Sequence, residues 1–430
     1  MLKRIYCITT FLGILFINAN SQKITAIQCG KLLDVNTGTV SSNQVIIVKN
    51  NIIQKIVSKA DFKDKVDSTV NLSDYFVLPG LIDCHTHVLL QGDITSDDYA
   101  EQLLKESIPY RTLRAARSAT IALNNGFTTI RDLETEGAMY ADVDVKKAIN
   151  NGVIPGPRMF VATRAINTVG HYPISPKEYN WELTLPKGIQ EINGADEARK
   201  AVREQLAHGA DWIKIYADRG YYRLTDGSFR SLPNFTKEEI EAIGDETLKS
   251  RKNFAAHAMT RDGILAAIAA GARSIEHGSG MDEECANAMA QKGVYWCPTI
   301  FVNDYVADGR AKEGSFINQQ FREAAPAIFK TAMKAGIKIA YGTDIGGYDW
   351  NLPEAKDFEF MVKYGLSPLQ AIQTATTTAA ALLEQDGKIG VIAPGAFADI
   401  IAIKGNPLTN IQLLQQVQWV MKDGKIWKSE

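Results

Sequence analysis

The sequence predicts a (β/α)8 TIM barrel with a small β-sandwich domain that is formed from both chain ends. Between about Leu78 and Leu383, eight short apolar runs alternate with amphipathic helical stretches, which is typical of parallel β/α repetition. The two chain ends are instead β-rich, and each is too short to hide an apolar face by itself. The 430 residues, 45% of them hydrophobic, are sufficient to bury a full-sized core.

The first 21 residues have the three parts of a secretory signal peptide. Lys3 and Arg4 form the charged start, an apolar run extends from about Ile5 to Ile17, and small residues precede Gln22. A retained membrane anchor is the alternative, but the apolar run is shorter than the ~20 residues that cross a bilayer. We therefore expect an exported protein, periplasmic or secreted, with no membrane contact after cleavage.

Both ends of the remaining chain predict strands. Residues 24–58 contain apolar runs with an Asn50-Asn51 turn, and residues 397–428 contain two more with Asp423-Gly424 as a hairpin signal. We expect the two ends to meet in one small domain. The expected boundaries are 1–21 for the signal peptide, 22–74 and 385–430 for the two parts of the small β domain, and 75–384 for the barrel.

The eight apolar runs predict the barrel strands. They occupy residues 77–90, 126–133, 158–166, 211–218, 253–259, 273–279, 294–300 and 337–347. Helical segments separate them, for example residues 194–210, in which Ala, Val and Leu recur every three or four positions. A doubly wound open sheet is the alternative, but no glycine-rich phosphate loop follows the first run.

The charge and the cysteine content exclude several classes of protein. A net charge of −2 gives no basic surface for nucleic acid, so a small-molecule partner is favoured. The cysteines are too sparse for a disulfide scaffold in a chain of this length. Buried free thiols are the simpler interpretation, and a Cys285–Cys297 pair in an oxidising compartment is the alternative.

A His-Thr-His motif closes the first apolar run. Side chains two apart on a strand point to the same face, so His85 and His87 project together and can hold one metal ion. Such a pair is also found in structural roles, but its position at the end of a barrel strand favours ligands. Asp83 lies on the same face, where it either supports these ligands or is a solvated acid.

Lys214 lies in the fourth run, on a strand that a parallel barrel buries on both faces. Because a buried ammonium group is costly, three interpretations compete: a lysine paired with an acid, a Schiff-base lysine, and a lysine carboxylated by CO2 that bridges two metals. Burial favours the neutral amine, the form that reacts with CO2. Histidines on neighbouring strands favour the bridging carbamate.

Three further candidates end the fifth, sixth and eighth runs. His257 and His277, alone, are each more typical of a buried core histidine than of a ligand. With the first strand, however, four of the chain's six His lie at the carboxyl ends of barrel strands, where catalytic sites form. Asp344 has small residues around it, and a helix N-cap is its alternative role.

These features resemble the binuclear amidohydrolase superfamily. The resemblance spans nearly the whole mature chain, from VLPGLIDCHTH in the first strand to GVIAPGAFADIIAI near the C-terminus. GFTTIRDL and DWIKIYAD are similar to the imidazolonepropionase-like and Xaa-Pro dipeptidase-like branch. That branch often has Gly-Gly-His after the third strand; the segment here is NTVGHYP, so His171 matches and Val169 replaces one glycine.

The resemblance implies two divalent metal ions. Zn2+ suits the mixed imidazole and carboxylate ligands best, and Mn2+, Co2+ or Fe2+ are the alternatives. The implied ligands are His85, His87 and Asp344 for the first metal, His257 and His277 for the second, and a CO2-derived carbamate on Lys214 as the bridge. A hydroxide between the metals would attack an amide carbonyl, while Asp344 carries the proton to the leaving amine. His171 would stabilise the oxyanion, or it is a surface loop histidine.

The expected function is hydrolysis of a C–N amide bond in a small molecule, a dipeptide of the Xaa-Pro type or an N-acyl amino acid. Tyr216 shares the face of Lys214 and is expected either to touch substrate or to be a packed ring. Arg164, Arg219 and Arg223 are the candidates for binding a substrate carboxylate.

Other functions remain alternatives. A cyclic amide of the imidazolone or hydantoin kind is the second substrate class. A Schiff-base lyase that uses Lys214 and a non-catalytic periplasmic binding protein are alternatives of different classes, and the surplus of histidines argues against both. The sequence leaves open whether the chain forms a homo-oligomer.

Overall fold

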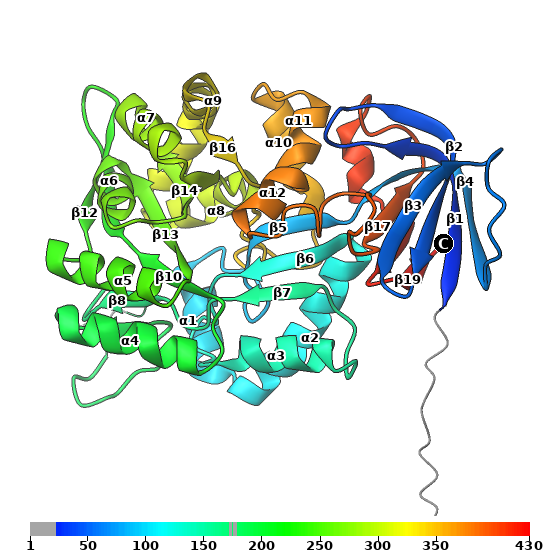
Figure 1. The fold of residues 1–430 in the computed structure, drawn as a ribbon. Helices are drawn as coiled ribbons and strands as arrows, with labels where there is room; N and C mark the ends of the chain where they lie inside the picture. Colours follow the sequence, from blue (N-terminus) through cyan, green and yellow to red (C-terminus); the bar gives the residue numbers. More distant parts are fainter. Residues whose placement is uncertain (1–22, 172–173, 175–178) are drawn as a thin grey trace, which may run out of the picture.

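A computed structural model describes residues 23–171, 174 and 179–430 of the chain. It consists of a barrel of parallel strands wrapped by helices and a small β domain beside it (Figure 1). The predicted signal peptide, residues 1–21, lies outside the described residues. Within the described part of the chain, none of the helices combines the length and apolarity that crossing a membrane requires.

The predicted fold, an α/β (β/α)8 barrel with a small domain from both chain ends, is confirmed. Each of the eight apolar runs contains a parallel barrel strand. Across the residues that the structure describes, nine strands form the barrel, because two of them, β7 and β8, take the place of the third predicted strand: β5 (Leu81–Thr86), β6 (Phe127–Asp132), β7 (Arg158–Val161), β8 (Ile166–Thr168), β10 (Trp212–Tyr216), β13 (Asn253–Thr260), β14 (Ser274–Gly280), β15 (Tyr295–Cys297) and β16 (Lys338–Ile339). Every residue of β5 and β6 is buried, as expected for strands covered on both faces.

The third predicted strand differs from the expectation because it is split into β7 and β8. β7 pairs with β6, and β8 pairs with β10, so the two short strands together join the halves of the barrel. Between them Thr163 has a positive φ of 59°, which interrupts the extended backbone. The barrel closes on its other side through hydrogen bonds from Cys84 N to Tyr341 O (2.9 Å) and from Asp344 N to His85 O (2.7 Å).

Helices cover the outside of the barrel (Figure 1). They are α1 (Ser96–Lys105), α2 (Ile108–Asn124), α3 (Ala141–Asn150), α4 (Ala195–Ala207), α5 (Lys237–Lys249), α6 (Arg261–Ala269), α7 (Glu283–Lys292), α8 (Ile300–Lys312), α9 (Ile317–Ala335), α10 (Asp357–Lys363), α11 (Pro368–Thr374) and α12 (Thr377–Leu382). Capping boxes begin α1 at Thr95 and α5 at Thr236, and Gly293 in the left-handed conformation ends α7. The predicted helical segment 194–210 is α4.

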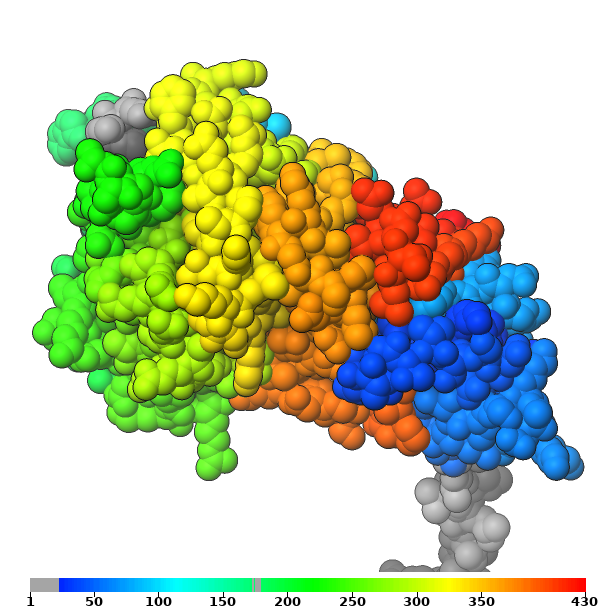
Figure 2. All heavy atoms as spheres, turned by 90° about the horizontal axis from the view of Figure 1, so that it is seen from above, coloured from blue at the N-terminus to red at the C-terminus, as the bar shows by residue number. Residues whose placement is uncertain are grey.

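The small domain contains one seven-stranded sheet, in the order β19-β18-β17-β4-β1-β2-β3. Its strands are β1 (Ile24–Leu33), β2 (Val40–Lys49), β3 (Ile52–Ser58), β4 (Ser68–Pro79), β17 (Ile400–Ile403), β18 (Trp419–Lys422) and β19 (Lys425–Ser429). The N-terminal and C-terminal parts join where β4 and β17 pair antiparallel. Figure 2 shows these blue and red segments together at one end of the molecule. β4 crosses the expected domain boundary at 74/75 and leads directly into β5.

Candidate functional site

The six predicted metal ligands converge at the carboxyl ends of the barrel strands. All of them line one cavity of about 270 Å3: His85, His87, Lys214, His257, His277 and Asp344. Four imidazoles follow one another around it, with ring centroids 5.2 Å apart for His87 and His85, 4.9 Å for His85 and His277, and 4.6 Å for His277 and His257. Five segments far apart in the sequence therefore meet at one place, as a barrel mouth requires.

The two nitrogens Nε2 of His85 and His87 face each other at 3.3 Å, with Oδ1 of Asp344 beside them at 3.5 and 3.0 Å. Burial opposes the charged form of Asp344, but the neighbouring histidines hold the pKa of its carboxyl below the usual range. Burial also works against protonation of His87, yet its contact with Asp344 raises the pKa of that imidazole to about 9. Two nitrogens and a carboxylate oxygen that converge in this way form a donor set for a cation, and the three side chains lie within metal-ligand reach of one another.

In each of the four histidines, one ring nitrogen lies against a protein group. Nδ1 of His85 lies 2.8 Å from Oε2 of Glu276, and Nδ1 of His87 lies 3.4 Å from Oε1 of Glu136. Nε2 of His257 lies 2.7 Å from the hydroxyl of Tyr221, and Nδ1 of His277 lies 2.7 Å from Oγ1 of Thr299. Metal-binding histidines characteristically have such a partner on the nitrogen that does not bind the metal. The residues present therefore fit the binding of a divalent metal, for which His85, His87 and Asp344 lie together.

Glu276 belongs to a buried charged network beneath the site. Its carboxylate receives a 2.9 Å hydrogen bond from the guanidinium of Arg131 and another from Ser274. Although burial opposes ionisation, Arg131 lowers the pKa of the Glu276 carboxyl below its usual range. Arg131 also donates to the backbone oxygen of Cys84 and lies 4.5 Å from the ring centroid of Trp212. The partner of His85 is thus held as a fixed anion.

The backbone is strained at two of the ligands. His277 and Asp344 have φ values of 67° and 62°, in the left-handed region that residues other than glycine rarely adopt. Gly346 contributes to this arrangement, because a Cβ atom there would lie 2.3 Å from the backbone oxygen of His87. Such strain persists only where the surrounding structure imposes it, which is common at functional sites.

Asp83 supports the site through the backbone rather than through an imidazole. Its Oδ1 accepts from His85 N at 2.9 Å, and its Oδ2 accepts from the hydroxyl of Thr343 at 2.5 Å. Burial raises the pKa of the Asp83 carboxyl to about 7. The side chain therefore ties the first strand to the residue before Asp344.

Lys214 is 1% exposed, and its Nζ lies 5.2 Å from the ring centroid of Tyr216. Among the described residues, no carboxylate lies within ion-pair distance of this amine. Tyr216 also lines the cavity, and its hydroxyl donates a 2.7 Å hydrogen bond to Glu134. The geometry gives no support to the alternative in which Lys214 is paired with an acid.

The walls of the cavity differ in character. Its other polar lining includes Asp93, Tyr99, Glu136 and Arg310, and its apolar lining includes Leu90, Met259, Val302, Val306, Ile317 and Phe321. Arg310 donates from Nη2 to the backbone oxygen of Asp93 at 2.8 Å and lies 3.3 Å from its carboxylate. Among the described residues, it is the arginine that lines this cavity.

The arginines proposed from the sequence lie elsewhere. Arg164 donates to the backbone oxygen of Ile189, and Arg219 donates to Pro233 O and Asn234 Oδ1. Arg223 lies 3.8 Å from Glu323. None of the three is among the described residues that line the metal-site cavity.

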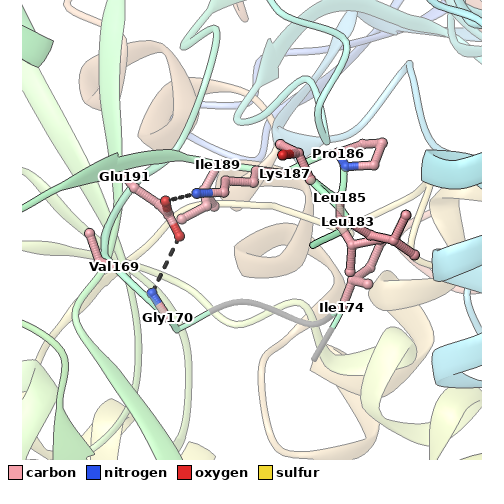
Figure 3. Close-up of a pocket in the computed structure, with 11 residues that line it drawn as sticks. Val169, Gly170, Ile174, Leu183, Leu185, Pro186, Lys187, Ile189 and Glu191 are labelled. Atoms are coloured by element: carbon pink, nitrogen blue, oxygen red, sulfur yellow. Dashed lines mark hydrogen bonds and ion pairs between the residues drawn. The ribbon is translucent and has the colours of Figure 1, made fainter. Parts of the chain in front are cut away.

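His171 is also absent from the described cavity lining, and its Nδ1 lies 2.7 Å from the hydroxyl of Thr168. Its loop forms a separate, largely apolar hollow of about 350 Å3 (Figure 3). Val169, Leu183 and Ile189 line this hollow, and Glu191 spans part of it by contacting Lys187 and Gly170. The predicted oxyanion role of His171 therefore gains no support from its described contacts.

Several residues of the site were not predicted from the sequence: Arg131, Glu136, Tyr221, Glu276, Thr299 and Arg310. Two of them carried a usable signal. Arg131 and Glu276 are charged residues inside apolar runs that a barrel buries, which is the same observation that singled out Lys214. Tyr221 lies on the hairpin of β11 (Asp218–Arg223) and β12 (Phe229–Pro233), and Arg310 lies on α8. No local sequence pattern specifies where the hairpin or this helix is placed.

The described cysteines are free and buried, in agreement with the simpler interpretation of the sequence: Cys29, Cys84, Cys285 and Cys297. Cys285 and Cys297 are therefore not paired in this structure.

Comparisons with known proteins agree with the geometry. The sequence profile of the amidohydrolase family matches residues 76–427. An ochratoxinase of Aspergillus niger is 32% identical over 446 residues, which cover 96% of this chain and 88% of that protein. An imidazolonepropionase of Cutibacterium acnes is 22% identical, with 78% of each chain covered.

Among solved structures, a Xaa-Pro dipeptidase with methionine bound in its active site is similar over 95% of this chain and 100% of that chain. The TM-score is 0.84 and the sequence identity 32%. The likeness therefore extends across both the barrel and the small domain.

Proposed function

Because the chain belongs to the amidohydrolase family, and is a hydrolase acting on carbon–nitrogen bonds, we propose that its substrate is a dipeptide of the Xaa-Pro type or an N-acyl amino acid. The observation that carries this proposal is the ring of four imidazoles, Asp344 and Lys214 around one cavity. The similarity to a Xaa-Pro dipeptidase supports the dipeptide. A cyclic amide is the second substrate class to be tested, because an imidazolonepropionase is also a relative.

Two divalent ions, which we propose to be Zn2+, would be held by the histidines and Asp344. When bound, such ions activate water and polarise a carbonyl group. We propose that a carbamate on Lys214 connects the two sites, since this amine is buried among the ligands and no described carboxylate pairs with it. The carbamate would form from CO2 and the amine of Lys214.

The protein's own groups have distinct tasks in this proposal. The carboxylate of Asp344 takes a proton from the attacking water and passes it to the leaving nitrogen, because it lies at the centre of the ligand group. Glu276, Glu136, Tyr221 and Thr299 orient the four rings. Apolar side chains that line the same cavity would contact an apolar part of the substrate.

The test combines metal analysis with a substrate screen. Purified protein is assayed for bound metal and screened against dipeptides, N-acyl amino acids and cyclic amides, before and after chelation. We expect hydrolysis of dipeptides or N-acyl amino acids that chelation abolishes and added Zn2+ restores. Hydrolysis that persists after complete metal removal, or a covalent adduct trapped on Lys214 by borohydride, would contradict the proposal.

A further inference from the structure

A small side pocket adjoins the cavity that the six predicted metal ligands line, which we call the catalytic cavity, at the side of His277. His277, Asn303 and Phe321 line both spaces. The side pocket measures about 30 Å3, against about 270 Å3 for the catalytic cavity. The three shared residues therefore form the boundary between the site and a second, much smaller space.

The side pocket is lined mainly by aromatic and aliphatic side chains between β15, α8, α9 and α10. These include Trp296, Pro298, Ile300, Ile328, Phe329, Phe360 and Tyr364. Surfaces of this kind favour apolar groups over water. An apolar substituent that entered from the catalytic cavity would find a compatible environment there.

Phe321 is the largest apolar side chain of the boundary. It is 1% exposed, and its ring centroid lies 4.8 Å from that of Phe229 and 6.1 Å from that of Tyr221. Tyr221 in turn contacts Nε2 of His257. The ring is therefore packed against the hairpin that holds one of the metal ligands, and it is fixed at the boundary.

We propose that Phe321 determines specificity by limiting the length of the apolar substrate side chain that lies beside His277. This inference rests on the proposed hydrolysis of dipeptides or N-acyl amino acids. The intact ring keeps the side pocket closed, so the enzyme accepts a small or medium apolar side chain at this position. Removal of the ring joins the two spaces and admits an aromatic side chain.

The test compares kcat/KM for dipeptides whose side chains increase from Ala through Val and Leu to Phe, on each side of the scissile bond. Phe321→Ala is expected to raise the ratio of Phe to Ala substrates about tenfold at one of the two positions, since each buried methylene changes specificity by a comparable factor. Phe321→Leu, a milder change that retains an apolar side chain, is expected to give an intermediate ratio.

Phe329→Ala is the matched control. Phe329 is equally buried and lies on the same helix, but it lines the side pocket only and packs on Trp296. Its removal enlarges the side pocket without opening the boundary, so the substrate ratio should stay at the wild-type value. Metal content and thermal unfolding are measured for every variant.

A substrate ratio that is unchanged at both positions, in a folded and metal-loaded Phe321→Leu or Phe321→Ala protein, would overturn the inference alone. An equal change in Phe329→Ala would also overturn it, because the boundary would then not be decisive. Absence of hydrolysis by the wild type would instead overturn the proposed function, and this inference with it.

Discussion

Replacing Glu276 with Gln removes the negative charge behind His85 while nearly preserving the shape of the side chain. In the structure, Oε2 of Glu276 lies 2.8 Å from Nδ1 of His85, and Oε1 accepts from Arg131 at 2.9 Å. Both carboxylate contacts are fully buried. The substitution therefore weakens the orientation of one ligand without removing any ligand.

Two effects of different size are expected. Loss of a partner that orients a metal-binding histidine typically lowers metal affinity 10- to 100-fold, about 1.4 to 2.7 kcal/mol. Arg131 also loses its carboxylate partner, and a buried charge left without its partner destabilises the fold by about 3–5 kcal/mol. The metal effect and the folding effect must therefore be measured separately.

Metal affinity is measured by equilibrating the protein with graded chelator and determining bound metal by mass spectrometry, and stability by urea unfolding of the metal-free protein. Glu354→Gln is the control, because Glu354 is equally buried but makes no described contact with a ligand ring. We expect weaker metal binding only for Glu276→Gln. A folded Glu276→Gln protein with wild-type metal affinity would show that Glu276 does not orient His85 for metal binding.

The remaining predictions concern individual side chains. Lys214→Ala and Lys214→Arg should both lower kcat about 10^3-fold or more, since neither alanine nor arginine can form the carbamate. A Lys214→Arg protein with normal turnover would exclude a carbamate on Lys214. Tyr221→Phe should lower the affinity for the metal beside His257 about tenfold, because it removes the hydroxyl that contacts Nε2 of that histidine. Tyr222→Phe is the control, since Tyr222 is 46% exposed and should leave the affinity unchanged. Equal effects of the two substitutions in the chelator titration would contradict the role of the Tyr221–His257 contact. Arg310→Ala should raise KM about tenfold for substrates with a free carboxylate, because Arg310 lines the cavity. Arg219→Ala should leave KM unchanged, because Arg219 lies outside the cavity lining. The reverse pattern in steady-state kinetics would favour Arg219, the residue predicted from the sequence, as the carboxylate-binding arginine.

The sequence predicted the barrel and the convergence of the ligands because both follow from periodic patterns. Alternating strands and helices place every strand end at one mouth. His85 and Asp344 therefore meet although they lie near opposite ends of the barrel sequence, with Nε2 of His85 3.5 Å from Oδ1 of Asp344. Position within a run was therefore enough to identify ligand candidates.

The features that the sequence did not predict depend on loops and on contacts across the barrel. His171 was expected at the site from its place after the third strand, but its described ring contact is local, with Thr168. Arg310 reaches the cavity from α8, and its role depends on how that helix packs rather than on any motif. The split of the third strand at Thr163 depends on a single positive φ, which an apolar run does not reveal.

The proposed binuclear site is tested by a crystal structure of the purified protein, with anomalous scattering data collected at the zinc absorption edge and metal content measured on the same sample. We expect two ions per chain in the cavity, one beside His85, His87 and Asp344 and one beside His257 and His277, with additional density on Nζ of Lys214 between them. A folded, active enzyme whose ions lie outside this cavity, or whose six side chains bind none, would contradict it.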